Sequence, residues 1–265
     1  MKKIKLILLL INIILIILTL FFELLIPAKI SLIIMLIIFA VLTNINIEKI
    51  KIIQKFIIIA LIVIIPIMFK ISFDAYKINQ NPILFEKEYN NVICTFNNVE
   101  STFYINGTGK SPSYESLSSV EWNKYKKGIK TLKIGDEIIT IGSNLFSNCN
   151  ALVNVYAPDT ITIIGNKTFF NCNKLSSFNT NKAYTIIIPK ETSIIGESAF
   201  EKCIRIQKLY LYKNIKEIYN NAFNCENLKE IYYEGTEEEW NEINFGNNVF
   251  PEDTEIYYNF NINNL

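Results

Sequence analysis

One motif recurs through the second half of the chain, and it constrains the fold more than any other feature. In three copies a phenylalanine follows a glycine by four residues and a cysteine follows it by seven: Gly142/Phe146/Cys149, Gly165/Phe169/Cys172 and Gly196/Phe200/Cys203. A fourth copy runs from Tyr219 through Phe223 to Cys225, with tyrosine in place of glycine and one residue missing before the cysteine. A motif that recurs roughly every 20 to 50 residues is typical of solenoids, in which each repeat contacts its neighbours.

The intervals between copies are 23, 31 and 23 residues. The segment Ile186–Pro189 matches Val155–Pro158, and both precede the next glycine by the same distance. The eight extra residues of the long interval therefore lie within 176–185. That stretch is rich in serine, asparagine and threonine, which predicts a loop bulging from one coil.

Between the motifs, apolar residues alternate with others as they do in a strand with one buried face. The inward pairs are Val155/Ala157, Ile186/Ile188, Leu209/Leu211 and Ile231/Tyr233. A single repeat cannot bury such pairs, but stacked coils bury them continuously when each strand pairs with the next at about 4.8 Å. A half-copy at residues 132–141 begins the stack.

The pattern Ile-Gly-x-x-x-Phe-x-x-Cys-x-x-Leu, followed by a strand and a proline, resembles the BspA-like leucine-rich repeat family. The entry segment, residues 103–132, and the exit segment, residues 231–243, resemble it as well, so the resemblance covers about residues 91–258. It implies a right-handed stack of short parallel strands with helical or turn segments. It also implies a bacterial or protist cell-surface recognition module, often an adhesin, without catalysis by the repeat itself.

Residues 1–77 are almost wholly isoleucine, leucine and phenylalanine. Three runs, at about 6–26, 30–47 and 53–71, predict transmembrane helices because roughly 20 apolar residues span a bilayer. Lysines before the first run and between the second and third place the N-terminus in the cytoplasm and the repeats outside. Two alternatives stay open: a cleavable signal peptide in the first run, and a two-span hairpin that leaves the polar half in the cytosol.

The expected fold class is therefore an α-helical membrane anchor joined to a repeat solenoid. Its predicted parts are a three-helix anchor (1–77), a linker with an N-terminal β cap (78–130), the solenoid (131–234) and a C-terminal cap (235–265). Three glutamates before Trp240 are typical of the first turn of a helix, where acids complement the helix dipole. We expect a multi-pass cell-membrane protein that contacts lipid through its N-terminal helices, with its solenoid on the extracellular side.

Composition excludes several functions. The chain has no histidine, which removes histidine bases, Ser-His-Asp and Cys-His nucleophiles, and histidine-bound zinc. Residues 78–265 hold 17 of the 26 basic and 22 of the 25 acidic residues, a net charge of −5. Nucleic-acid binding needs clustered lysine and arginine, so we expect no nucleic-acid partner. We also expect no enzymatic activity, no cofactor and no metal.

Five cysteines are present: Cys94, Cys149, Cys172, Cys203 and Cys225. The last four keep nearly the same phase in successive coils. Disulfides are permitted outside the cell, but parallel side chains on stacked coils leave the Cβ atoms farther apart than a disulfide allows. A metal site would need the sulfurs to converge. We favour a buried column of thiols that acts as small apolar core.

One position between the inward pairs faces outward in each coil. Its residues are Lys133, Tyr156, Ile187, Tyr210 and Tyr232. Stacked at strand spacing, they form an aromatic and apolar stripe, which predicts a binding surface for another protein or a surface glycoconjugate. Cross-strand stacking that merely stabilises the sheet is the alternative. A structural role as an envelope protein or spacer without a dedicated ligand also stays open.

Overall fold

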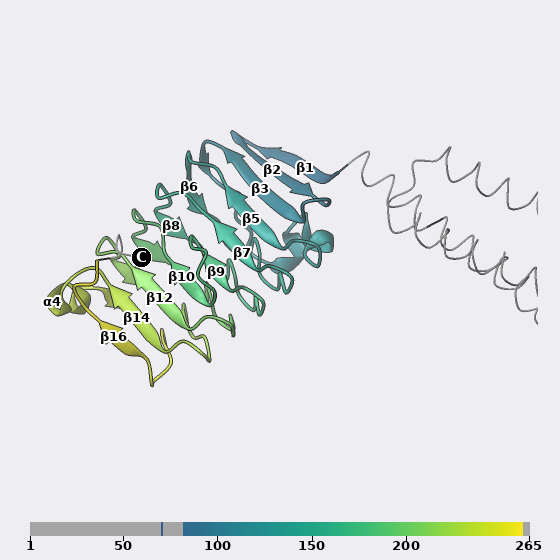
Figure 1. Ribbon diagram of the computed structural model, residues 1–265. Coiled ribbons are helices and arrows are strands. Elements are labelled where there is room, and N and C mark those ends of the chain that lie inside the picture. The colour runs from purple at the N-terminus through teal and green to yellow at the C-terminus, as the bar shows by residue number, and fades with distance from the viewer. Residues whose placement is uncertain (1–69, 71–81, 262–265) are drawn as a thin grey trace, which may run out of the picture. The chain divides into compact units, whose positions relative to one another are not determined.

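The computed structural model describes Lys70 and residues 82–261. The chain divides into two compact units, Met1–Pro82 and Ile83–Leu265, and the description below concerns the second. Its strands form a ten-stranded sheet, which we call sheet A, and a six-stranded sheet, which we call sheet B (Figure 1).

Sheet A begins as an antiparallel meander and continues as a parallel stack. Strand β1 (Ile83–Tyr89) is antiparallel to β2 (Val92–Asn97), and β2 is antiparallel to β3 (Thr102–Gly107). From β3 onward every pairing is parallel. The later strands, in spatial order, are β5 (Thr131–Ile134), β7 (Asn154–Tyr156), β9 (Ser177–Phe178), β10 (Thr185–Ile187), β12 (Lys208–Leu211), β14 (Glu230–Tyr233) and β16 (Glu255–Tyr257).

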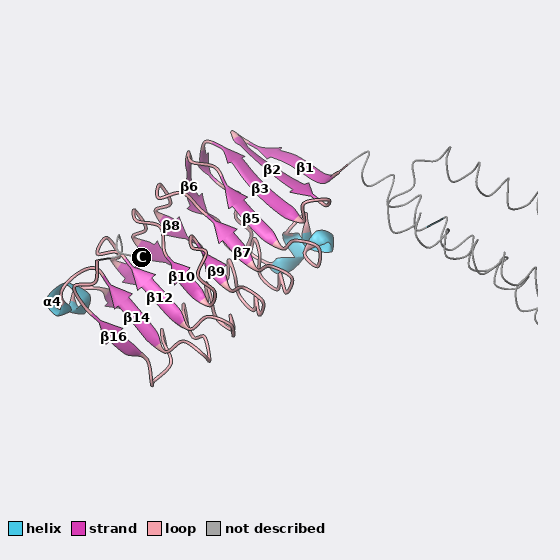
Figure 2. Ribbon diagram, in the orientation of Figure 1, coloured by secondary structure: helices cyan, strands magenta, loops and turns pink. Residues whose placement is uncertain are grey.

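Sheet B is parallel throughout and uses shorter strands. They are β4 (Gly109–Lys110), β6 (Ile138–Ile141), β8 (Ile163–Ile164), β11 (Ile194–Ile195), β13 (Glu217–Ile218) and β15 (Asn244–Phe245). The helices of the second unit are brief: two 3₁₀ turns, η2 (Leu117–Ser119) and η3 (Asn123–Tyr125), and one α-helix, α4 (Glu237–Asn241), at the C-terminal end of the stack (Figure 2).

From β3 to β15 each coil contributes one strand to sheet A and one to sheet B, except that one coil contributes both β9 and β10 to sheet A. The core lies between the two sheets. In β14 the side chains of Ile231 and Tyr233 are buried, while Glu230 and Tyr232 alternate with them on the outer face. On the opposite side Ile164, Ile195 and Ile218 are fully buried. β-Branched residues suit these half-buried strands, so the sequence alternation predicts the inward set.

The Gly-x-x-x-Phe-x-x-Cys motif forms the third side of each coil, and this side is built of turns rather than helices. Two positions after the glycine, or after Tyr219, the backbone takes a positive φ; these residues are Asn144, Lys167, Ser198, Asn221 and Asn248. Backbone amides on this side also bond to the next coil. The amide of Phe146 donates to Thr168 O at 2.9 Å, and that of Phe169 donates to Ala199 O at 2.8 Å.

The repeated glycine is required by the close approach of successive coils. A Cβ on Gly196 would lie 2.5 Å from the backbone nitrogen of Asn166, and a Cβ on Gly165 would lie 2.6 Å from that of Ser143. Contacts this short force the neighbouring backbone to move, so positions 165 and 196 need a residue without a side chain.

The fourth copy departs from the motif, but its core residues keep their places. Tyr219 is 45% exposed and its hydroxyl donates to Glu217 Oε2 at 2.6 Å. The missing residue shortens the turn, because the amide of Cys225 donates to Phe223 O, two residues back, at 2.6 Å. Phe223 and Cys225 are nevertheless fully buried, so both departures alter the turn alone.

The helix expected before Trp240 is confirmed as α4. It begins with a capping box: the amide of Glu239 donates to the Thr236 hydroxyl at 3.2 Å, and the Thr236 amide donates to Glu239 Oε2 at 2.9 Å. The buried Trp240 ring packs against Tyr233, with ring centroids 5.2 Å apart. The helix thus places an aromatic side chain over the last coils.

The insertion at 176–185 is more than the loop that its composition predicts. Ser177 and Phe178 form an additional strand, β9, which lies between β7 and β10 in sheet A. Phe178 is fully buried between Phe169 and Phe200, with centroid distances of 5.7 and 5.8 Å. One apolar ring in a polar segment is enough to fill an inward position, so the prediction of a loop alone is wrong.

The expected membrane anchor requires a correction. In the described part of the chain no helix is long and apolar enough to cross a bilayer, and α4 has five residues. Isoleucine and leucine in this part alternate with polar residues and form strands. The fold class with N-terminal transmembrane helices, and with it the multi-pass membrane localisation, is not upheld. The three runs, at about 6–26, 30–47 and 53–71, lie outside the described residues except for Lys70.

Candidate functional site

The outward residues of sheet A form a row that crosses the paired strands, which we call the outer row. The strand register aligns Lys133 with Tyr156, Ile187 with Tyr210, and Tyr210 with Tyr232. At its two ends the same register adds Tyr104, opposite Lys133, and Tyr257, opposite Tyr232. Neither tyrosine is among the residues predicted from the sequence, although residues 255–257, Glu-Ile-Tyr, repeat residues 230–232.

The outer row is interrupted where β9 enters the sheet. β7 pairs with β9 rather than with β10, so Tyr156 and Ile187 are not neighbours. The residue after Phe178 is Asn179, whose Oδ1 accepts a hydrogen bond from the Ala157 amide at 2.7 Å. The row therefore falls into two groups: Tyr104, Lys133 and Tyr156 make the first group, and Ile187, Tyr210, Tyr232 and Tyr257 make the second group.

The first group is loosely arranged. The Lys133 Nζ lies 5.8 Å from the centroid of the Tyr104 ring, within the range of a cation–π contact. The Tyr104 hydroxyl donates to a Glu100 carboxylate oxygen, and this hydrogen bond raises the pKa of Tyr104. Tyr156 is 40% exposed, so its ring face is available to a partner.

The second group is a stack of parallel rings. Tyr210 and Tyr232 have centroids 4.6 Å apart and ring planes 9° apart, and Tyr232 and Tyr257 follow at 5.0 Å and 16°. Tyr257 is 42% exposed, but Tyr210 is 5% exposed. The outward position expected for Tyr210 is correct, yet the ring is covered by its neighbours. The contribution of any of these residues to binding stays a prediction.

A polar row runs beside the second group and fixes its hydroxyls. Lys208 Nζ lies 2.6 Å from Glu230 Oε2, and the Tyr232 hydroxyl donates to the same carboxylate oxygen. The hydrogen bonds from Lys208 and then Tyr232 lower the pKa of Glu230, and the bond to Glu230 raises the pKa of Tyr232 to about 12. Tyr257 repeats the arrangement with Glu255. The rings of Tyr232 and Tyr257 are thus oriented by the carboxylates that lie two residues earlier on the same strands.

The cysteines lie in the interior, remote from the outer row in every coil. All five are free and buried. The thiols of Cys172, Cys203 and Cys225 each donate to the backbone oxygen of the phenylalanine one coil earlier, at 3.1, 3.2 and 3.1 Å. Burial raises the pKa of the Cys225 thiol to about 12. Within the described residues no group of three or more cysteines and acids could hold a metal ion.

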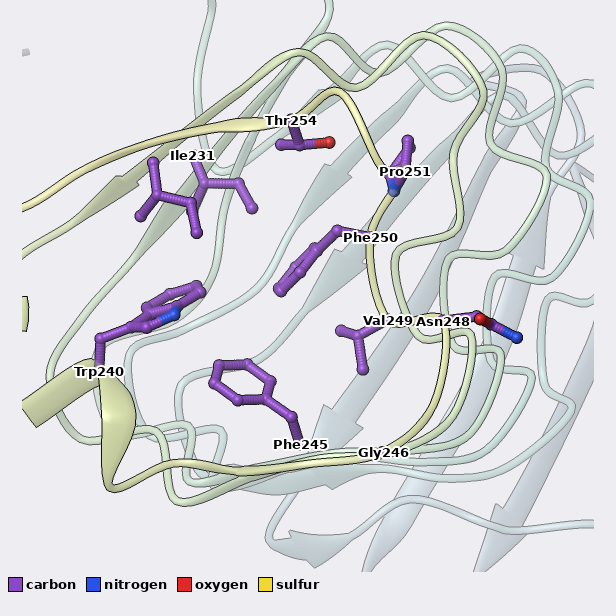
Figure 3. Close-up of a pocket in the computed structure, with 10 residues that line it drawn as sticks. Ile231, Trp240, Phe245, Gly246, Asn248, Val249, Phe250, Pro251 and Thr254 are labelled. Atoms are coloured by element: carbon purple, nitrogen blue, oxygen red, sulfur yellow. The ribbon is translucent and has the colours of Figure 1, made fainter.

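A cavity lies at the C-terminal end of the stack, apart from the outer row. Its volume is about 370 Å³, and its lining includes Trp240, Phe245, Phe250 and Ile256 (Figure 3). The Trp240 and Phe250 centroids are 5.9 Å apart, and those of Trp240 and Phe245 are 5.0 Å apart. The rings fill much of the space where the side chains of another coil would pack.

The family model described as a BspA type leucine rich repeat region matches residues 117–187 and 176–264, with six copies. The two matches together cover more than half of the 265 residues. This match confirms the resemblance that the glycine, phenylalanine and cysteine spacing indicates.

Solved structures similar to this chain are also leucine-rich repeat proteins. One from Eubacterium ventriosum is 22% identical with a TM-score of 0.45, and the alignment covers 55% of this chain and 42% of that one. A leucine rich cell surface protein from Faecalibacterium prausnitzii is 19% identical with a TM-score of 0.39, covering 66% and 55%. The T. pallidum leucine rich repeat protein is 19% identical with a TM-score of 0.37, covering 63% and 92%.

This chain therefore spans about half the length of the first two. Among curated proteins, no relative matches it.

Proposed function

Because this chain belongs to the BspA-type leucine-rich repeat family, we propose that it binds another protein through the outer row of sheet A. The observation that carries the proposal is the exposed aromatic row itself. Tyr156 and Tyr257 are about two-fifths exposed on a face that is built from paired strands. Exposed aromatic side chains on a rigid face are typical anchors of protein interfaces.

The chemistry of the face favours recognition over catalysis. The outer row offers ring faces, one apolar side chain and one lysine. The hydroxyls of Tyr104, Tyr232 and Tyr257 donate to Glu100, Glu230 and Glu255. Proteins of this family typically bind other proteins or serve structural roles. Recognition of a protein on a host or neighbouring cell, as in adhesion, is the finer form of the proposal.

Photo-cross-linking from the outer face tests the proposal. A benzophenone amino acid replaces Tyr156 or Ile187 in separate full-length proteins, which are expressed in the source cells and irradiated. The matched control replaces Ile204, which is 43% exposed but lies in the turn segment after Cys203 rather than in sheet A. We expect a discrete protein adduct from Tyr156 and Ile187 and none from Ile204.

An adduct from Ile204 alone, or equal adducts from all three positions, would reject the outer row as the binding face. A purely structural role makes a different prediction. If the rings only support the sheet, alanine at Tyr156 together with Tyr232 leaves every adduct formed from Ile187 unchanged.

A further inference from the structure

The chain's own C-terminal segment folds back onto the second group. After β16 the backbone turns at Asn259, which has a φ of 56°. The Asn259 amide donates to Gly235 O at 2.8 Å, and the Phe260 amide donates to Tyr233 O at 3.0 Å. These two bonds hold the segment against the end of β14 and direct Phe260 to the outer face.

Phe260 contacts two neighbouring rings of the stack, Tyr210 and Tyr232. Its centroid lies 4.8 Å from that of Tyr232 and 5.5 Å from that of Tyr210, with ring planes tilted by 56° and 53°. Both separations lie within the range of roughly 4.5–7 Å over which aromatic rings interact favourably. The ring that Phe260 contacts on β12, Tyr210, is 5% exposed, whereas Tyr156 on the same row is 40% exposed.

We propose that Tyr210 and Tyr232 form an acceptor site for an aromatic side chain of an extended peptide, and that Phe260 occupies this site in the isolated chain. The proposal rests on the proposed function and adds the partner's chemistry and a mode of regulation. The occupant is a segment of this chain, and its residues 259–261, Asn-Phe-Asn, show the chemistry that fits: one aromatic ring flanked by uncharged amides.

The acidic border of the site supports that choice. Glu230 and Glu255 lie two residues before Tyr232 and Tyr257 on the same strands, and Lys208 pairs with Glu230. Uncharged amides beside the aromatic residue avoid repulsion from these carboxylates. A peptide with acidic residues next to its ring would place like charges together, so the site discriminates against it.

A tethered occupant competes with any partner. Phe260 is joined to the acceptor strands by a short segment, so its effective concentration at the site is at least in the millimolar range. A partner's apparent affinity falls in proportion to the fraction of molecules in which the site is open. Removing the Phe260 ring therefore opens the site without changing the acceptor rings. The expected result is tighter binding of an aromatic peptide to the altered chain than to the natural one.

The test uses a fluorescein-labelled peptide of residues 256–261 and measures its anisotropy with the full chain. We expect Phe260→Ala to bind this peptide at least tenfold more tightly than the natural chain does. In the Phe260→Ala background, Tyr210→Leu and Tyr232→Leu each weaken binding at least tenfold, while the matched control Tyr219→Leu, at an exposed tyrosine outside sheet A, leaves it unchanged. A peptide with alanine in place of its Phe260 does not bind.

Equal binding to both chains, no binding to either, or binding that survives Tyr210→Leu and Tyr232→Leu would overturn the inference. Circular dichroism establishes that each variant is folded. Tyr232→Leu, at the less buried ring, decides the matter if Tyr210→Leu does not fold. The result is independent of the cross-linking test: adducts from Tyr156 without peptide binding reject this site and leave the proposed function in place.

Discussion

Two aromatic ladders run the length of the stack, one inside and one outside, and they differ in continuity. The inner ladder connects Phe146, Phe169, Phe200, Phe223 and Phe250 at centroid distances of 5.1 to 6.0 Å, with ring planes within 23°. The outer row has stacked rings in its second group alone, at centroid distances of 4.6 and 5.0 Å, and the row is broken at β9. One repeat period produces both ladders, but they differ in burial. Phe146, Phe169, Phe200 and Phe223 are fully buried, whereas Tyr156 and Tyr257 on the outer row are about two-fifths exposed.

The largest expected effect comes from breaking the inner ladder at Phe200. This ring is fully buried and stacks on Phe169 and Phe223. Phe200→Ala therefore leaves a cavity between these two rings. We expect a loss of about 3–5 kcal/mol in the free energy of unfolding, measured by urea denaturation. Tyr156→Ala, on the exposed face, is the matched control and should change stability little. Equal losses at the two positions would abolish the distinction between the ladders.

A smaller effect, the pH dependence of the free energy of unfolding, tests whether the Cys225 thiol is buried. The pKa of Cys225 is raised to about 12 in the folded chain, from an ordinary value of 9.0. A raised pKa means that the stability contribution is complete below pH 9 and is lost as pH rises from 9 through 12. At pH 10 the loss from this thiol is on the order of 1 kcal/mol. Urea denaturation under reducing conditions at pH 8 and pH 10 should therefore show a smaller decline for Cys225→Ala. Identical declines would show that the thiol is not buried.

The sequence predicts the inner ladder well and the outer row incompletely. The glycine, phenylalanine and cysteine spacing reports directly on residues that share one environment in every coil, and those residues are buried together. The insertion hides an additional strand because two residues, Ser177 and Phe178, are too few to show a period. A fifth Gly-x-x-x-Phe copy, Gly246 to Phe250, was also missed because it has no cysteine.

The state of Tyr210 depends on contacts that no local pattern encodes. Its burial comes from Tyr232 in the next coil and from Phe260, fifty residues later in the chain. Exposure on the outer row is set by such distant neighbours, whereas position on the row is set by strand alternation. Strand position was therefore predictable and accessibility was not.

The smallest expected effect is in the polar row beside the outer ladder. Lys208 and Glu230 form an ion pair at 2.6 Å, with side chains 41% and 30% exposed. Exposed pairs contribute about 0–1 kcal/mol, so Lys208→Met should lower the free energy of unfolding by that amount or less. The difference should shrink in 1 M salt, since salt screens exposed charges. A loss as large as that of Phe200→Ala would make the outer face structural.

Thiol labelling tests the central claim most directly, because the chain carries natural reporters on the inside and can be given one on the outside. The claim is that the fold buries all five cysteines, while Tyr156 on the outer row is exposed to solvent. Iodoacetamide treatment, followed by mass spectrometry, should label none of the five thiols in the native chain and all five in urea. The variant Tyr156→Cys should gain a single rapid label in the native state. Rapid native labelling of Cys149, Cys172 or Cys203, or protection of the cysteine at position 156, would contradict the account.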